Sequence, residues 1–99
     1  MEVTKNLVED AMTVAVAGRL DTSTSPQLEN DLKAVPEAVK RLTLDFSRLE
    51  YISSAGLRVV LNTHKIMKAR GCELALTGLN ATVRRVFDIT GFSPILKFV

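Results

Sequence analysis

Two adjacent serines are the first side chains in this sequence that could do chemistry. Ser53 and Ser54 lie in the stretch YISSAGLRVV, residues 51–60, between an apolar run typical of a strand and one typical of a helix. A serine at such a junction can cap the helix, act as a nucleophile or accept a modification. One serine is enough for a cap, which leaves the other free for modification.

A nucleophilic role for Ser54 is not supported by its neighbours. A hydrolase nucleophile elbow needs small residues two positions before and two positions after the serine. Gly56 meets this requirement, but Ile52 does not. The single histidine, His64, falls on the apolar side of the following helix, as an ordinary helix-face histidine does, so no Ser/His/Asp relay is predicted. We therefore expect no catalytic residue.

Phosphate-binding loops and metal sites also lack support. Neither of the glycine-rich patterns GxxxxGK[ST] and GxGxxG occurs in the chain. One cysteine, Cys72, and one histidine cannot supply a ligand cluster, so we expect no metal and no cofactor. Because Cys72 opens an apolar run, it is interpreted as a small buried hydrophobic residue.

Two carboxylates and two arginines are predicted to have structural roles. Asp21 precedes a threonine-rich helix start, where a turn residue or a helix-dipole partner is common. Asp45 lies inside an apolar run, where an unpaired carboxylate is costly. It is therefore predicted to anchor a neighbouring loop, and the serine loop is one candidate. Arg84 and Arg85 are expected to form a solvated helix face.

Length, composition and charge limit the classes of function. The 99 residues predict one domain, residues 1–99, with a single core. Only 5% of the residues are aromatic, and the basic and acidic residues are interspersed, with a net charge of +2. Both observations argue against nucleic acids and membrane surfaces as partners. No apolar run approaches the roughly 20 residues that cross a bilayer, and no secretory leader opens the chain. A cytoplasmic location is therefore expected.

Strands and helices alternate along most of the chain. Strands are predicted at residues 2–8, 11–18, 41–46 and 72–77, with residues 95–99 as a possible last strand and residues 41–46 at the centre. One helix is predicted to begin at a capping box, Thr24-x-x-Gln27, and to carry Leu28, Leu32, Val35 and Val39 on one face. Two more are predicted at residues 54–69, ended by Gly71, and between Asn80 and Gly91.

This order of elements, β-β-α-β-α-β-α-β, predicts an α/β fold. We expect a mixed, mostly parallel sheet of four to five strands with about three helices. In such sheets, ligands and partners meet the loops at the carboxyl ends of the strands. Two loops qualify, the one that follows Gly18 and the one that holds the two serines. Asp21 and Ser54 are therefore expected on one surface.

Three stretches of the chain resemble the anti-sigma factor antagonist family, whose fold is the STAS domain. They are GRLD (18–21), LDFSRLEYISSAGLRVVL (44–61) and VRRVFDITGF (83–92), and the resemblance covers nearly the whole chain. The family pattern is close to apolar-Asp-Ser-Ser-Gly-Leu. In that pattern the first serine is phosphorylated by a partner anti-sigma factor, which is also a serine kinase. The resemblance implies a single STAS-like domain.

The resemblance implies that Ser54 is the phosphorylated residue. Ile52 takes the apolar position, and Ser53 takes the position of the acidic residue. This substitution removes a charge beside the switch and leaves open that Ser53 itself is modified. Ala55 replaces the second serine of the pattern, so that alternative hydroxyl is lost.

Other residues around the Ser54 hydroxyl are implied to serve partner binding. Gly56 and Leu57 match the family pattern, and with Asp21 and Ser53 they would provide contacts and loop geometry. The implied partners are the serine-kinase anti-sigma factor and a serine phosphatase. The unmodified protein would bind the anti-sigma factor and so release a sigma factor for transcription, without being an enzyme.

Two alternatives stay open at this point. STAS-like domains also serve as scaffolding modules of larger regulatory or transport-associated assemblies, without a phosphorylation switch. An enzyme or a nucleotide-binding α/β domain is the other alternative, for which the sequence offers only Ser54 and its loop.

Overall fold

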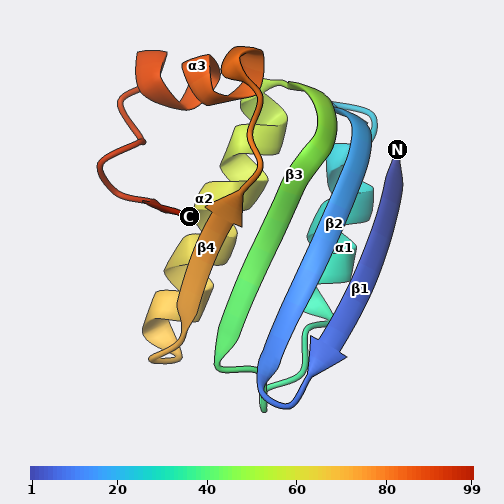
Figure 1. Ribbon diagram of the computed structural model, residues 1–99, viewed down its shortest axis with the longest axis vertical. Helices are drawn as coiled ribbons and strands as arrows, with labels where there is room; N and C mark the ends of the chain where they lie inside the picture. Colours follow the sequence, from blue (N-terminus) through green and yellow to red (C-terminus); the bar gives the residue numbers. More distant parts are fainter.

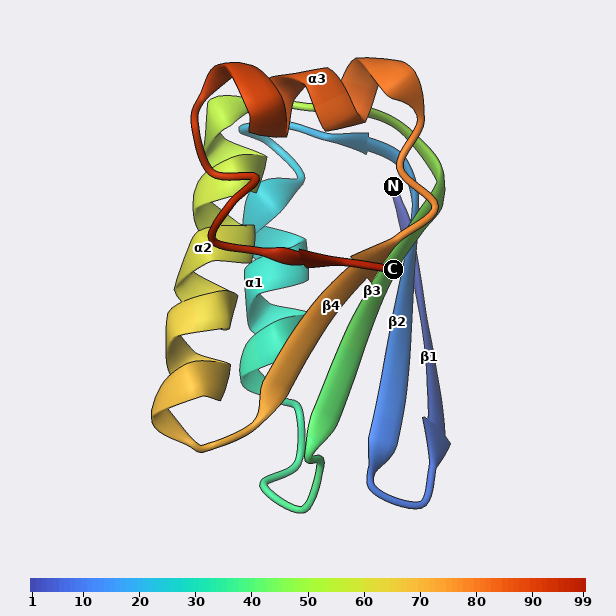
Figure 2. The same cartoon turned by 60° about the vertical axis from the view of Figure 1, so that its left-hand side comes forward.

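Helices cover one face of a five-stranded sheet and leave the other face open, as the computed structural model of all 99 residues shows (Figures 1 and 2). The strands are β1 (Glu2–Val8), β2 (Ala11–Leu20), β3 (Arg41–Ile52), β4 (Glu73–Thr77) and β5 (Lys97–Phe98). The helices are α1 (Ser25–Lys33), α2 (Ser54–Ala69) and α3 (Ala81–Ile89). None of the helices is both long and apolar enough to cross a membrane.

The sheet has the predicted mixed, mostly parallel arrangement. Its strand order is β1-β2-β3-β4-β5, with β1 antiparallel to β2 and every other pair parallel. The β1–β2 connection is the expected hairpin, in which Glu9 adopts a left-handed φ of 56°. The predicted order of eight elements and the central place of β3 are confirmed.

The core lies between the sheet and its helices. Alternate residues of β2 are buried, namely Met12, Val14 and Val16, while the residues between them are partly exposed. Leu28 and Leu32 of α1 pack into the same core. In Figure 2, α3 lies across the upper end of the sheet, where it buries Val83 and Phe87. Because helical and strand periodicities point their apolar residues inward, one core results, as predicted.

The strand predicted at residues 41–46 is in fact twice as long, because β3 runs to Ile52. Its pairing with β2 continues past two register shifts, between Ala15 and Ala17 and again after Gly18. Exposed polar residues in the second half hide this continuation in the sequence. Asp45 was predicted to anchor a neighbouring loop, with the serine loop as one candidate, and this was wrong. Its Oδ1 instead accepts the N–H of Ser47, within β3, at 2.9 Å.

The predicted capping box of α1 was also wrong. Thr24 makes no side-chain cap bond: its hydroxyl oxygen accepts the Asp21 N–H at 2.9 Å, and its O–H donates to the Arg19 carbonyl at 2.8 Å. The helix ends at Lys33, since the proline at position 36 disfavours helical backbone just before it. Val35 and Val39 therefore lie beyond the helix, although both are buried.

Cys72 is less buried than predicted, whereas the α3 arginines and the bounds of α2 agree with the predictions. Cys72 is a free thiol that packs against the core but is only partly buried, because it precedes β4. Arg84 and Arg85 are exposed on α3, as expected. The α2 helix has the predicted bounds, 54–69.

Candidate functional site

The two loops singled out in the sequence meet at the carboxyl edge of the sheet. Leu20 and Ile52 pair at the ends of β2 and β3, and the next residues are Asp21 and Ser53. The Ser53 N–H donates to the Leu20 carbonyl at 2.9 Å. Parallel pairing thus brings the start of the Asp21 loop to the start of the serine loop, at the upper edge of Figure 1.

The two serines have different structural roles. Ser53 is the N-cap of α2: its backbone is extended, and its hydroxyl oxygen accepts the Gly56 N–H at 3.3 Å. Ser54 is the first residue of the helix and is exposed. The hydrogen bonds of the loop engage the Ser53 side chain and not the Ser54 hydroxyl. The Ser54 hydroxyl is therefore exposed and unengaged, whereas the Ser53 hydroxyl serves as the helix cap.

Gly56 lets the start of α2 lie directly against the end of β2. A Cβ atom built on this buried residue would be 2.7 Å from Cγ of Leu20 and 3.0 Å from Cγ1 of Ile52. Leu57, the next residue, is 3% exposed and belongs to the core. These two residues fix the position of the first helical turn, and with it the position of Ser54.

Asp21 organises the neighbouring loop through hydrogen bonds. Its Oδ1 accepts from the Ser23 hydroxyl at 2.8 Å, from the Ser23 N–H at 3.0 Å and from the Thr24 N–H at 3.2 Å. The Ser23 hydroxyl, helped by the bonds from Thr24, holds the pKa of Asp21 below its usual range, against the opposing effect of partial burial. Arg19 lies 4.0 Å from the second carboxylate oxygen and stacks on Tyr51.

A shallow hollow of about 240 Å³ opens beside Ser54. Its walls come from α2 and from the end of α3, and its lining residues are Ser54, Leu57, Arg58, Leu61, Thr90 and Phe92. Three of these side chains are apolar. The hydroxyl of Ser54 therefore lies at the rim of a surface that can receive an apolar side chain from a partner.

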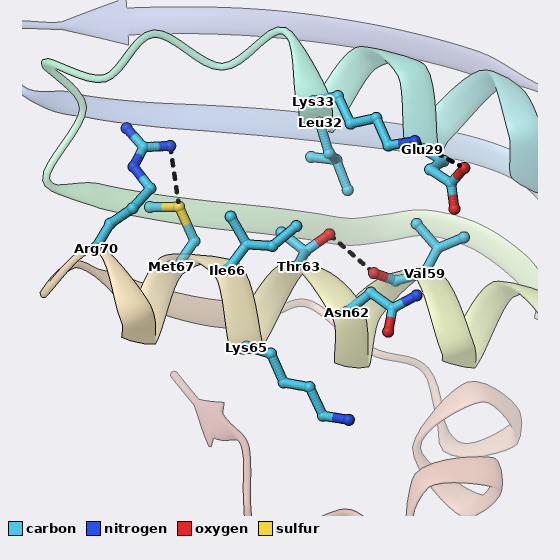
Figure 3. Close-up of a pocket in the computed structure, with 10 residues that line it drawn as sticks. All are labelled: Glu29, Leu32, Lys33, Val59, Asn62, Thr63, Lys65, Ile66, Met67 and Arg70. Carbon is cyan, nitrogen blue, oxygen red and sulfur yellow. Dashed lines mark hydrogen bonds and ion pairs between the residues drawn. The ribbon is translucent and has the colours of Figure 1, made fainter.

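A larger groove of about 510 Å³ lies between α1 and α2 (Figure 3). Its apolar lining consists of Leu32, Val59, Ile66 and Met67, and its cations are Lys33, Lys65 and Arg70. Figure 3 shows the Thr63 hydroxyl turned back to the Val59 carbonyl, at 2.8 Å. The sequence does not indicate this groove, because it arises from the way two amphipathic helices pack together.

Neither hollow has the composition of a catalytic or metal centre. No three His, Cys, Asp or Glu side chains lie close enough to hold a metal ion. His64 is partly buried on α2 and lines neither hollow. The site consists of one exposed hydroxyl, a helix start packed closely against β2 and an apolar surface.

The family model described as "Mlab, STAS domain" matches residues 3–97, so the chain belongs to the STAS domain family. Within that family it is similar to BtrV of Bordetella bronchiseptica, a candidate anti-sigma factor antagonist, with 40% identity over 96% of this chain and 83% of the relative. It is also 34% identical to an anti-sigma-B factor antagonist of Listeria monocytogenes, over 89% of this chain and 78% of the relative. The protein is a member of the anti-sigma factor antagonist family.

Solved structures show the same fold. The unphosphorylated form of the anti-sigma factor antagonist SpoIIAA superposes with a TM-score of 0.83, at 23% identity over 99% of this chain and 88% of that one. An anti-sigma factor antagonist from Mycobacterium paratuberculosis gives 0.88, at 22% identity over 98% and 83%. The curated relatives are named as regulatory antagonists rather than as enzymes.

Proposed function

We propose that this protein binds an anti-sigma factor that is also a serine kinase, and that phosphorylation of Ser54 ends the binding. Binding of the unmodified protein releases a sigma factor for transcription in the cytoplasm, and a serine phosphatase resets the switch. The proposal rests on the different roles of the two serines: Ser53 caps α2, while the Ser54 hydroxyl is exposed and unengaged.

The residues around Ser54 would contribute to partner binding in different ways. Asp21 and Ser53 hold the two loops in place, and Asp21 has its second carboxylate oxygen at the surface beside Arg19. Gly56 sets the distance between α2 and β2, and Leu57 forms the inner wall of the hollow beside Ser54. We assign partner contact to the exposed groups and loop geometry to the buried ones.

The fold is suited to carry a phosphate without rearrangement. A phosphate at the start of α2 would interact favourably with the helix dipole, by about 0.3–1 kcal/mol. SpoIIAA occurs in a phosphorylated form, and that form also has the fold of this chain, with a TM-score of 0.78 at 21% identity. The switch therefore changes the surface and leaves the architecture intact.

The same phosphate is costly across an interface. It carries a charge of roughly −1.5 to −2 near neutral pH. One like-charge contact at about 4 Å costs on the order of 4 kcal/mol at an effective dielectric constant near 20, which is about a thousandfold in affinity. Because this penalty exceeds the local stabilisation, phosphorylation ends binding.

The experiment is phosphorylation by the serine-kinase anti-sigma factor of the same genome with ATP, followed by mass-spectrometric mapping. We expect the modification to vanish in Ser54→Ala and to persist in Ser53→Ala, which loses about 1 kcal/mol of stability with its cap. Ser54→Asp should bind the kinase less tightly, with an unchanged circular dichroism spectrum. Modification that persists in Ser54→Ala and vanishes in Ser53→Ala would assign the switch to Ser53.

A scaffolding role without phosphorylation is the second candidate. A sulfate transporter family protein from Wolinella succinogenes has the same fold, with a TM-score of 0.80 at 19% identity. Stable stoichiometric binding of the kinase homologue, with no phosphate transferred to either serine, would favour this role over the switch.

A further inference from the structure

Arg58 is a surface cation without a counterion. It is exposed on α2 and takes part in none of the six ion pairs of the structure. Arg41 and Arg84 have acidic partners and Arg70 donates to the Pro36 carbonyl, whereas Arg48 and Arg85 are, like Arg58, in none of these pairs. The guanidinium of Arg58 is therefore available to an anion.

The position of Arg58 relative to Ser54 is specific. The two residues are four apart on one helix, and both line the hollow that opens between α2 and the end of α3. Side chains at this spacing are neighbours, and a helical side chain leans toward the N-terminus of its helix. The Arg58 side chain can thus reach the turn that carries Ser54. An anion at the earlier position and a cation at the later one is also the favourable order.

Few acidic groups near Ser54 and Arg58 could pair with the Arg58 guanidinium. The first turn of α2 contains no acidic residue. From α1, Glu29 shares a second hollow with Arg58, but its carboxylate is paired with Lys33 at 3.3 Å. From the α3 side the hollow beside Ser54 is lined by the uncharged Thr90 and Phe92. A phosphate on Ser54 would therefore meet no acidic side chain among the residues that line this hollow with Arg58.

We propose that Arg58 is the intramolecular counterion of the phosphate on Ser54, an inference that rests on the proposed function. A guanidinium can offer two parallel N–H donors to phosphate oxygens, which makes such a pair directional as well as attractive. Phosphorylation then changes the surface twice, because it adds an anion and also withdraws a free cation from the partner. Arg58 is a positioning residue for the modified serine.

The test measures the phosphate itself and needs no kinase. Phosphoserine is placed at position 54 during translation, and its second pKa is followed by phosphorus-31 NMR in the full chain. We expect Arg58→Gln to raise that pKa by about 0.3 of a pH unit, the size of one exposed i,i+4 charge pair. Arg85→Gln is the control, because it removes the same charge from an exposed site on α3 that lines neither hollow.

The outcomes separate this inference from the proposed function. An unchanged pKa in Arg58→Gln, or an equal rise in Arg85→Gln, would overturn the role of Arg58 while leaving phosphorylation of Ser54 intact. If the kinase does not modify Ser54 but the NMR shift is found, the proposed switch fails and the pairing of Arg58 with an anion at position 54 stands.

Discussion

At the scale of single residues, Asp21 shows how one carboxylate can organise a loop. It accepts hydrogen bonds from Ser23 and Thr24, while the Thr24 hydroxyl accepts the Asp21 N–H at 2.9 Å. These bonds favour the charged form of the carboxylate in the folded state. They also occupy the threonine hydroxyl that a capping box would have used at the start of α1.

Replacing Asp21 by Asn should therefore have a pH-dependent effect. Because the pKa is lowered on folding from its usual 3.8, Asp21 contributes stability that is present above that value and is lost as the pH falls through the folded-state pKa. Urea unfolding should show Asp21→Asn less stable than the wild type at neutral pH, with the difference narrowing under acid conditions. A difference independent of pH would contradict this assignment.

The two serines mark the limit of sequence reasoning at this scale. The residues alone predict that one serine caps the helix and the other is free; only the family resemblance points to Ser54 as the free one. That choice depends on where β3 ends, and Ile52 is its last residue. The end of β3 is set by the pairing of Ile52 with Leu20, which a local sequence pattern does not reveal.

At the scale of elements, the contact between α2 and β2 depends on Gly56. Alanine at an ordinary helical position is more favourable than glycine by about 1 kcal/mol. Here its Cβ would lie 2.7 Å from Cγ of Leu20, which is fully buried in the core. Overpacking of this kind costs roughly 1–3 kcal/mol, so alanine at position 56 should destabilise the protein instead of stabilising it.

We expect Gly56→Ala to lower the free energy of unfolding, as measured by chemical denaturation. Asn62→Ala is the control, because Asn62 is exposed on the same helix and alanine there should be neutral or stabilising. A stabilising effect of Gly56→Ala would show that α2 can move away from β2 without cost. Binding of the proposed kinase partner to the same variant would report whether the distance between α2 and β2 matters for the proposed switch.

The elements also differ in how well their sequences predicted them. The α2 helix was placed correctly because its apolar periodicity runs from the serine loop to Gly71 without interruption. The second half of β3 was missed because Ser47, Arg48 and Glu50 are exposed where the strand continues along β2. Pairing over a register shift stabilises a strand that its own residues do not indicate.

At the scale of the whole molecule, stability should be uneven across the sheet. The edge strand β1 pairs with β2 alone, and every β1 residue except Val3 is exposed. β3 pairs on both sides and buries Leu42, Leu44 and Phe46 completely or nearly so. Few buried contacts and a single partner strand make local opening easier.

Native-state hydrogen exchange followed by NMR should detect this difference. We expect the paired amides of β1 to exchange through local opening, well before those of β3, which should exchange through global unfolding. Equal protection in the two strands would mean that the hairpin unfolds only together with the core. The same experiment on Ser54→Asp should leave the protection of β3 unchanged.

The topology was predictable because it follows from the alternation of strands and helices and from the handedness of their crossovers. The groove between α1 and α2 was not, since it depends on the size of the side chains where two helices meet. The same holds for Arg58: its spacing from Ser54 is visible in the sequence, but its lack of a partner is a property of the folded surface.

The antiparallel hairpin has a practical consequence for assays of this protein. It returns Met1 to the carboxyl end of β2, where the Met1 Cα is 3.5 Å from the Cβ position of Gly18. An affinity tag or fluorophore joined there would emerge beside the Asp21 loop and should weaken binding of the proposed kinase partner. Val99 pairs its N–H with Leu76 at 2.9 Å, half-way down the sheet in Figure 1. Immobilisation through Val99 would keep the serine loop facing the solution.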